Sequence, residues 1–521
     1  MERDKIKYLF QISVLFAITY AICLYKNDSG IGFTVFGVVN SIILFSIIKR
    51  RNIHINGWHI FYGLGEIVLS TIPMLFTNEF CVFVSKLLYI ILMIKWVITI
   101  YFRIEKLEFV RNISIFFIFI LESIGQILAP FSDINILMSK ENDGERKENH
   151  TGEKENISMP DILVRNTPMH DTMTPKSKFS QIVIGIVLAA PILFVVLLLL
   201  MSADVVFRKV IVNIVINLFM GVDNVIAMIK WFITFALAFI AAYGLGRVLL
   251  IKRLKTEPVI QNKIDNVIGV TFTSIFAFVY AVFCLIQIVA LLNTSGSILP
   301  SGVTYASYAR QGFFQLLFVC IINIIMVLVC KLKFEDGRAF RKIMMVICGC
   351  TYIMTGSSAY RMILYIRIYQ LTFLRVLVLW ALLVIAVTMS FVTVFIYKEN
   401  IPLFEYLLIS ITVLFIAFAF MSPDRIIAKY NISHMNKNSN NDINYLINEL
   451  TEDAAVIIIE NIDKIESNMN KDDNRNYNKD WAVRYCEKIS DKYEEKYDED
   501  IRSFNVSGYI AYIKAKEYLN N

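Results

Sequence analysis

The chain has 521 residues, a formal net charge of +7, 57% hydrophobic residues and only 18% charged ones. Soluble domains average roughly 45–50% apolar and about 25% charged residues, so this composition excludes an ordinary soluble globular protein. There is no soluble basic face with interleaved aromatic residues, and we therefore expect no nucleic-acid partner.

Apolar runs of the length needed to cross a bilayer, about 20 residues, recur along the chain. They predict an all-α fold, a polytopic transmembrane helix bundle of about 11 spans within a range of roughly 10 to 13. Since Ile113–Pro130 carries Glu122 and Gln126, we expect this run to be re-entrant or interfacial. The candidate spans are Tyr8–Tyr25, Ile31–Ile48, His59–Thr77, Cys81–Phe102, Ile113–Pro130, Gln181–Ser202, Ala227–Leu250, Ile268–Leu292, Gln311–Cys330, Ile343–Ile363, Phe373–Tyr397 and Pro402–Met421.

A hydrophilic segment, residues 131–178, divides these spans into two groups. It holds 7 Lys and Arg, 9 Asp and Glu, and hardly any aromatic residue. Because such a segment cannot bury enough apolar surface to order itself, we predict a disordered linker. The predicted N-terminal transmembrane group is then 1–130, and the predicted C-terminal transmembrane core is 179–421.

Residues 422–521 are predicted to form a small, soluble, acidic and mainly helical tail domain, with helices over Tyr445–Ile459 and Trp481–Tyr493. From Asp424 onwards the chain carries 14 Lys and Arg against 19 Asp and Glu, a net charge of −5, whereas the preceding part carries +12. Short cytoplasmic loops collect Lys and Arg, so we place the N-terminus and the basic loops in the cytoplasm and the tail domain outside. The basic loops are 49–51, 247–263 and 331–342.

The residues typical of metal and enzyme sites are scattered. Cys348 and Cys350 are too close together and too deep in a span for a zinc pair, and the five histidines form no group. We expect the cysteines to act as small apolar residues, with no structural disulfide, metal or cofactor. No GxSxG, HExxH or GxxxxGK[ST] motif is present, so the sequence identifies no catalytic residue and does not favour an enzyme.

The polar stretch LPSGVTYASYARQGFFQL, Leu299–Leu316, lies where a span should begin. One interpretation is a polar pocket open to the outside, in which Arg310 holds a phosphate or a carboxylate. The other is that the tyrosines anchor at the interface, Arg310 reaches the headgroups and the glutamines bond to neighbouring helices. The candidate binding residues here are Tyr305, Tyr308, Arg310, Gln311 and Gln315.

A second polar cluster would lie along one face of an unbroken helix. No single span can run from Ile343 to Tyr397, so we predict a turn near Tyr369–Thr372. The arginines of this second cluster are interpreted either as ligands of an anion or lipid headgroup, or as structural partners of carboxylates. The candidate binding residues from this cluster are Arg361, Tyr365 and Arg375.

Charged residues also occur inside the predicted spans, namely Glu66, Lys86, Lys95 and Glu122. Ionisable groups in a membrane are candidate functional groups, and Glu–Lys pairing makes a proton or ion path conceivable. No second spaced carboxylate supports such a path in the sequence.

Several segments together resemble the bacterial membrane family catalogued as domain of unknown function 4173, from about Gln181 to the C-terminus. The resemblance implies a bacterial multi-pass membrane protein of the cell membrane, and it brings no activity. The chain departs from the expected pattern at Gln370, where that family favours glycine, and this departure bears on the predicted turn. The segments are Ser202–Phe207 (SADVVF), Tyr243–Arg247 (YGLGR), Leu299–Leu316, Tyr360–Arg375 (YRMILYIRIYQLTFLR) and Arg502–Tyr509 (RSFNVSGY).

Three hypotheses for the function remain. The first is transport or handling of an anionic or lipid-linked substrate, bound by Arg310, Arg361 and Arg375. The second is a membrane-bound enzyme of envelope assembly, and the third is a sensor or scaffold that acts through the tail. The expected partners are the lipid bilayer and an anionic lipid or small anion.

Overall fold

The computed structural model describes residues 2–26, 29–102, 109–139, 222–252, 263–292, 313–435, 440–468, 481–495 and 500–520. These residues are helical apart from turns, loops and one isolated parallel bridge between Ile264 and Phe334. They form two compact units, Met1–Pro130 with Ala238–Asn521, and Phe131–Leu237. The cavities and contacts described below all lie in the first unit.

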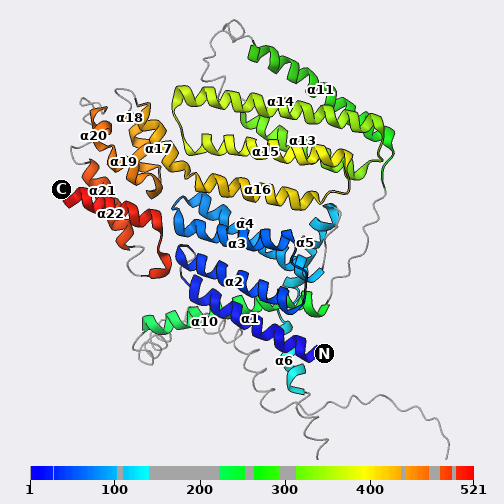
Figure 1. Cartoon of the computed structure of the whole chain (residues 1–521), viewed down its shortest axis with the longest axis vertical. Helices are drawn as coiled ribbons and strands as arrows, with labels where there is room; N and C mark the ends of the chain where they lie inside the picture. The colour runs from blue at the N-terminus through cyan, green and yellow to red at the C-terminus, as the bar shows by residue number, and fades with distance from the viewer. Residues whose placement is uncertain are drawn as a thin grey trace, which may run out of the picture. The chain divides into compact units, whose positions relative to one another are not determined.

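The first unit contains a bundle of long helices that lie side by side (Figure 1). Helices α1 to α5 pack in chain order, as do α13 to α16, while α11 packs against α14. Helix α16 packs against α3, which joins the early helices to the late ones. The helices are α1 (Glu2–Leu24), α2 (Ile31–Arg50), α3 (Gly57–Leu75), α4 (Glu79–Phe102), α5 (Phe109–Ile124), α11 (Asn266–Leu292), α13 (Phe313–Lys333), α14 (Arg338–Tyr369), α15 (Phe373–Tyr397) and α16 (Leu403–Phe420). Helices α6 (Ala129–Ser139) and α10 (Val222–Arg247) each begin in one unit and end in the other.

Nine helices of the described residues are long and apolar enough to cross a membrane: α1, α2, α4, α10, α11, α13, α14, α15 and α16. They coincide with nine of the predicted spans, so the all-α polytopic bundle is confirmed. Of the other three predicted spans, Gln181–Ser202 lies outside the described residues. Helix α3 carries His59, Glu66 and Pro73, and α5 has only 16 residues; neither is among the nine.

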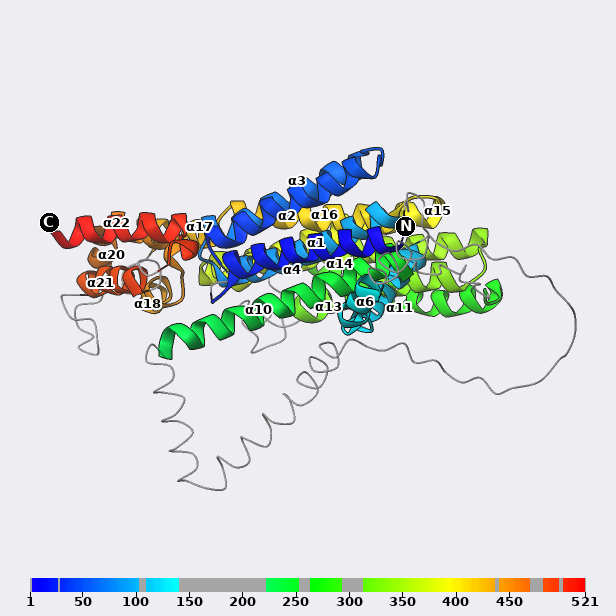
Figure 2. The same ribbon diagram turned by 90° about the horizontal axis from the view of Figure 1, so that it is seen from below.

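The helices alternate in direction, so their connections gather at two ends of the bundle (Figure 2). One end carries the start of α1 and the basic ends of α2 and α13. The other end, which we call the tail end, carries the end of α1, the start of α2 and the connections 76–78 and 370–372, and it meets the C-terminal helices. The basic residues at the ends of α2 and α13 therefore lie at the end opposite to the tail.

The C-terminal residues form short helices around a core of their own, which includes Leu446, Ile458, Ile465, Cys486 and Ala511. The predicted helix Trp481–Tyr493 is present as α21. The predicted helix over Tyr445–Ile459 was wrong as one element, because the chain turns at Leu450 and Thr451 between two shorter helices. The elements are α17 (Pro423–Ser433), α18 (Asn440–Asn448), η2 (Glu452–Ala454), α19 (Ala455–Glu460), α20 (Ile462–Ser467), α21 (Trp481–Tyr493), η4 (Ile501–Ser503) and α22 (Val506–Asn520).

The division into domains at 130, 178 and 421 remains a prediction. Most of the predicted linker, including residues 140–178, lies outside the described residues. Its first residues belong to α6.

The turn between α14 and α15 is where the sequence predicted it. Helix α14 ends at Tyr369, and Gln370 has φ 69° and ψ 179°. This conformation is nearly restricted to glycine. The turn therefore forms although the chain has Gln370 where glycine was expected, and Gln370 is strained. Asn431 of α17 holds the turn, since its side chain accepts from the Leu371 amide at 2.9 Å and donates to the Leu371 carbonyl at 2.8 Å.

Gln370→Gly is expected to stabilise the protein by about 1 kcal/mol, because a strained non-glycine residue costs about 1–3 kcal/mol. The variant loses only one long hydrogen bond, from Gln370 Nε2 to the His434 carbonyl at 3.3 Å. Thermal unfolding in detergent would measure the change. Gln370→Ala is the control, since it loses the hydrogen bond and keeps the strain. A glycine variant no more stable than the alanine variant would contradict the prediction.

Candidate functional site

The C-terminal helices are fastened to the tail end of the bundle by two buried carboxylates. Asp453 accepts from the Thr77 amide at 2.8 Å, from the Thr77 hydroxyl at 3.0 Å and from the Asn78 amide at 3.2 Å. Asp424 accepts from the Asn78 side chain at 3.0 Å and from the Thr451 hydroxyl at 2.5 Å. Both acids are at most 2% exposed, so the connection between α3 and α4 is bound from two sides.

Asp424 is placed for this contact by the local sequence. Pro423 begins α17, a position where its fixed φ and missing N–H are favourable. Asp424 then lies in the first turn, where the helix dipole favours a negative charge.

The segment Arg502–Tyr509, one of the motifs noted in the sequence, makes further contacts with the tail end. Asn505 donates to the carbonyls of Pro73 and Phe76, both at 2.9 Å, and is 3% exposed. Arg502 donates to the Ile22 carbonyl at 2.8 Å. The motif therefore joins the C-terminal helices to α1 and α3.

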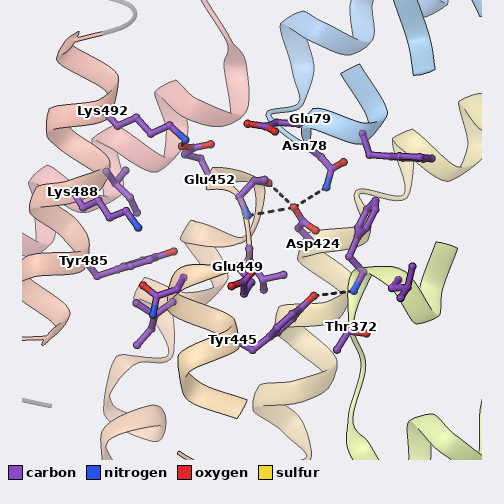
Figure 3. Close-up of a pocket in the computed structure, with 18 residues that line it drawn as sticks. Asn78, Glu79, Thr372, Asp424, Tyr445, Glu449, Glu452, Tyr485, Lys488 and Lys492 are labelled. Atoms are coloured by element: carbon purple, nitrogen blue, oxygen red, sulfur yellow. Dashed lines mark hydrogen bonds and ion pairs between the residues drawn. The ribbon is translucent and has the colours of Figure 1, made fainter. Parts of the chain in front are cut away.

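A cavity of about 710 Å³ lies where the C-terminal helices meet the bundle. Figure 3 shows Tyr485, Lys488 and Lys492 entering it from α21, opposite Asn78 and Glu79 at the start of α4. Its remaining walls come from Thr372, Phe373 and Leu374 at the start of α15, from Asp424 of α17 and from the segment 445–452. The walls thus come from five segments far apart in the sequence, and none of the predicted site residues that the structure describes is among them.

The cavity wall combines apolar side chains with polar side chains of both charges. Burial raises the pKa of Glu452, but the hydrogen bond and charge of Lys492 lower it more, so the pKa falls overall. Burial and the neighbouring Glu452 raise the pKa of Tyr485, so its phenol is neutral at pH 7. Beside the wall, burial raises the pKa of Asp453, and hydrogen bonds from Thr77 offset only part of the rise. Such a wall can hydrogen-bond a polar ligand through both donors and acceptors.

Two of the predicted binding residues, Gln315 and Arg361, line a second cavity of about 360 Å³ between α11, α13 and α14. Arg361 is 7% exposed and donates from Nη2 to Gln287 Oε1 at 2.5 Å. The Ser357 hydroxyl donates to the same oxygen at 3.0 Å. The other lining residues are Val279, Tyr280, Phe283, Leu316, Val319 and Met354.

Gln287 was missed by the sequence analysis. It is the one amide in the apolar run Ile268–Leu292, and a lone polar residue in a span is a signal that could have singled it out. The structure therefore defines a polar group of Gln287, Ser357 and Arg361 at the wall of a mainly apolar cavity.

The other predicted residues are elsewhere. Tyr305, Tyr308, Arg310 and Gln311 lie outside the described residues. The Arg375 guanidinium lies 4.4 Å from the centre of the Tyr365 ring. Arg375 also donates to the carbonyls that end α14, including that of Tyr369 at 2.6 Å, so it supports the turn. A binding role for Tyr365 and Arg375 remains a prediction.

Two of the four charges predicted inside spans are buried. Lys95 forms an ion pair with Glu405 of α16 at 2.9 Å, and both side chains are less than 10% exposed. Glu66 is fully buried. In the described part of the chain, no three or more His, Cys, Asp or Glu residues are arranged to hold a metal ion.

The surface of the long helices indicates the class of protein. Large apolar side chains point outward from them; Phe83, Phe278 and Phe318, for example, are each more than 60% exposed. Water does not tolerate continuous apolar surface of this extent, whereas lipid does. Together with nine helices of spanning length in the described residues, this surface defines a multi-pass integral membrane protein.

The chain belongs to the family Domain of unknown function (DUF4153), whose model matches residues 63–461, more than half of the chain. The match agrees with the sequence resemblance in pointing to a family of unknown function, but the family is DUF4153 and not domain of unknown function 4173. The match also begins at residue 63, within α3, and so includes α4. The motifs noted in the sequence all lie after Gln181. No curated protein and no solved structure matches the chain.

Proposed function

We propose that the protein binds and handles an amphiphile with an anionic headgroup, such as a lipid-linked phosphate, in the cavity between α11, α13 and α14. The observation that carries this proposal is the buried Arg361 guanidinium at the wall of a mainly apolar cavity among spanning helices. A permanent charge at such a place is costly, and ionisable residues among spanning helices are candidate functional groups.

The chemistry of the wall fits the two parts of such a ligand. Guanidinium donors match the oxygens of a phosphate or carboxylate, and the Gln287 amide holds Arg361 in position. The side chains of Val279, Phe283 and Val319 offer an apolar surface for a lipid chain. The volume of about 360 Å³ lies within the usual range for ligand sites.

The positive-inside rule supports placing the basic end of the bundle in the cytoplasm and the tail end outside, in the membrane of a bacterial cell. Arg361 lies eight residues before the end of α14, or about 12 Å below the tail end at 1.5 Å per residue. In this orientation a lipid of the outer leaflet can bring its headgroup to Arg361.

The alternatives are a membrane-bound enzyme of envelope assembly, or a sensor or scaffold that acts through the tail. Both would use the polar cavity of Figure 3, whose donors and acceptors suit a soluble polar ligand. The same binding experiment separates them from the proposed function, because the two cavities share no residue.

We expect Arg361→Gln to weaken the binding of dioctanoyl phosphatidic acid by about tenfold or more, because a hydrogen bond to a charged group contributes about 1.5–3 kcal/mol. Calorimetry in nanodiscs would measure this, with dioctanoylglycerol and inorganic phosphate as probes of each half of the ligand. Arg367→Gln, on the exposed part of the same helix, is the matched control. If Lys488→Ala abolishes binding and Arg361→Gln does not, the cavity of Figure 3 is the site and the proposal is wrong.

A further inference from the structure

Glu66 lies near the middle of α3 and has no exposed surface. Its Oε2 atom accepts one hydrogen bond, from the Ser41 hydroxyl of α2 at 3.2 Å. Its Oε1 atom is buried and has no hydrogen-bond partner among the described residues. A carboxyl group with one neutral donor and one unsatisfied oxygen is unusual in a protein interior.

In the part of the chain that the structure describes, the helices packed against this part of α3 form no ion pair with Glu66. Helix α2 contributes the neutral side chains of Ser41 and Asn40, and α4 contributes the Tyr89 phenol, which accepts from Asn40 at 3.0 Å. On α4, Lys86 lies one turn before Tyr89, with its ammonium 6.0 Å from the centre of the Phe33 ring of α2, and Lys95 binds Glu405 of α16 at 2.9 Å.

An ionised carboxylate in this place would be a buried charge with a single hydroxyl donor. Burying such a charge costs far more than burying the neutral acid, so the group takes up a proton instead. The neutral acid carries no charge, and its O–H group is a hydrogen-bond donor. The geometry therefore fits the acid form of Glu66 and does not fit the carboxylate.

We propose that Glu66 is a proton-binding site of the bundle, which holds its proton while α2, α3 and α4 are closed around it and releases it when their movement admits water. The ligand is a proton, and the site is separate from the cavity at Arg361. It would link any opening of this helix group to proton release. The proposal does not depend on the nature of the substrate.

Dicyclohexylcarbodiimide, an apolar reagent that reacts with protonated carboxyl groups, tests the proposal. The acid proton moves to a nitrogen of the reagent, and the carboxylate oxygen adds to its central carbon. The resulting O-acylisourea rearranges to a stable N-acylurea, so the reaction is an addition in which no atom leaves and nothing is oxidised. We expect mass spectrometry of the protein in nanodiscs to find Glu66 labelled at neutral pH and progressively less labelled at alkaline pH.

Glu405 is the matched control, because it is a second buried carboxyl group and forms an ion pair with Lys95 at 2.9 Å. We expect it to stay unlabelled in the natural chain and to become labelled in Lys95→Met, whereas Glu66→Gln removes the label at position 66. Labelling of Glu405 but not of Glu66 in the natural chain would overturn the proposal.

Infrared difference spectroscopy of the natural chain against Glu66→Gln reads the protonation state without requiring access of a reagent. We expect the variant to lose the carbonyl stretch of a protonated carboxylic acid at neutral pH. Loss of carboxylate bands in its place would show an ionised Glu66 and would overturn the proposal. Circular dichroism of both proteins checks that the variant folds.

Discussion

Lys95→Met is expected to destabilise the bundle by about 3–5 kcal/mol, because removing one partner of a buried ion pair leaves the other charge uncompensated. The side chains of Lys95 and Glu405 are 4% and 8% exposed, and their charged atoms are 2.9 Å apart. Asn112 of α5 completes the group, since Lys95 Nζ donates to its side-chain oxygen at 2.5 Å. The pair thus joins α4 and α16, with α5 held beside them. Reversible unfolding in mixed micelles would measure the loss.

The double variant Lys95→Met/Glu405→Leu separates charge from packing. We expect it to recover most of the lost stability, because replacing both partners of a buried pair by apolar residues is often neutral or stabilising. Lys514→Met is the control: Lys514 pairs with Glu517 on the exposed face of α22, and its loss should not be measurable. A double variant as unstable as Lys95→Met alone would contradict this explanation.

Asp453→Ala is expected to weaken the attachment of the C-terminal helices by several kcal/mol. Three donors, the Thr77 amide and hydroxyl and the Asn78 amide, lose their acceptor, and each buried donor left without a partner costs about 1–3 kcal/mol. Hydrogen–deuterium exchange would show the effect directly, since the amides of Thr77 and Asn78 should lose protection before the helices of the bundle do.

The controls for this second variant lie within the same helices. Asp463→Ala removes an exposed carboxylate of α20 and should leave exchange at Thr77 unchanged. Asp453→Asn keeps one acceptor oxygen and should have an intermediate effect. Unchanged protection of Thr77 and Asn78 in Asp453→Ala would show that the attachment depends on other contacts, such as those of Asn505.

Much of the fold follows from local patterns in the sequence. The nine spanning helices of the described residues were all predicted, because an apolar run of about 20 residues needs no knowledge of its neighbours to be identified. The turn at Gln370 was predicted for a similar reason, since a helix from Ile343 to Tyr397 would be too long for one span. The helix over Tyr445–Ile459 was wrong, because the turn at Thr451 is held by Asp424, a contact that periodicity does not show.

The candidate site was only partly predicted. Arg361 and Gln315 were chosen separately for their polarity in apolar surroundings, and the packing of α13 against α14 brings them to one cavity. Gln287 was not chosen, although it holds Arg361, because α11 and α14 are 74 residues apart at this contact. The cavity of Figure 3 was not predicted at all, because its wall is assembled from segments that lie far apart in the sequence.

The sequence by itself determined that this is an all-α multi-pass membrane protein, with basic loops apart from an acidic tail, since composition and charge act locally on how each segment meets lipid or water. Only the tertiary structure decided which polar groups meet. Asp453 binds Thr77 across 376 positions of the chain, Lys95 meets Glu405, and Glu66 has one hydroxyl donor. These pairings depend on how the helices pack, and packing is a property of the whole bundle that no single segment carries.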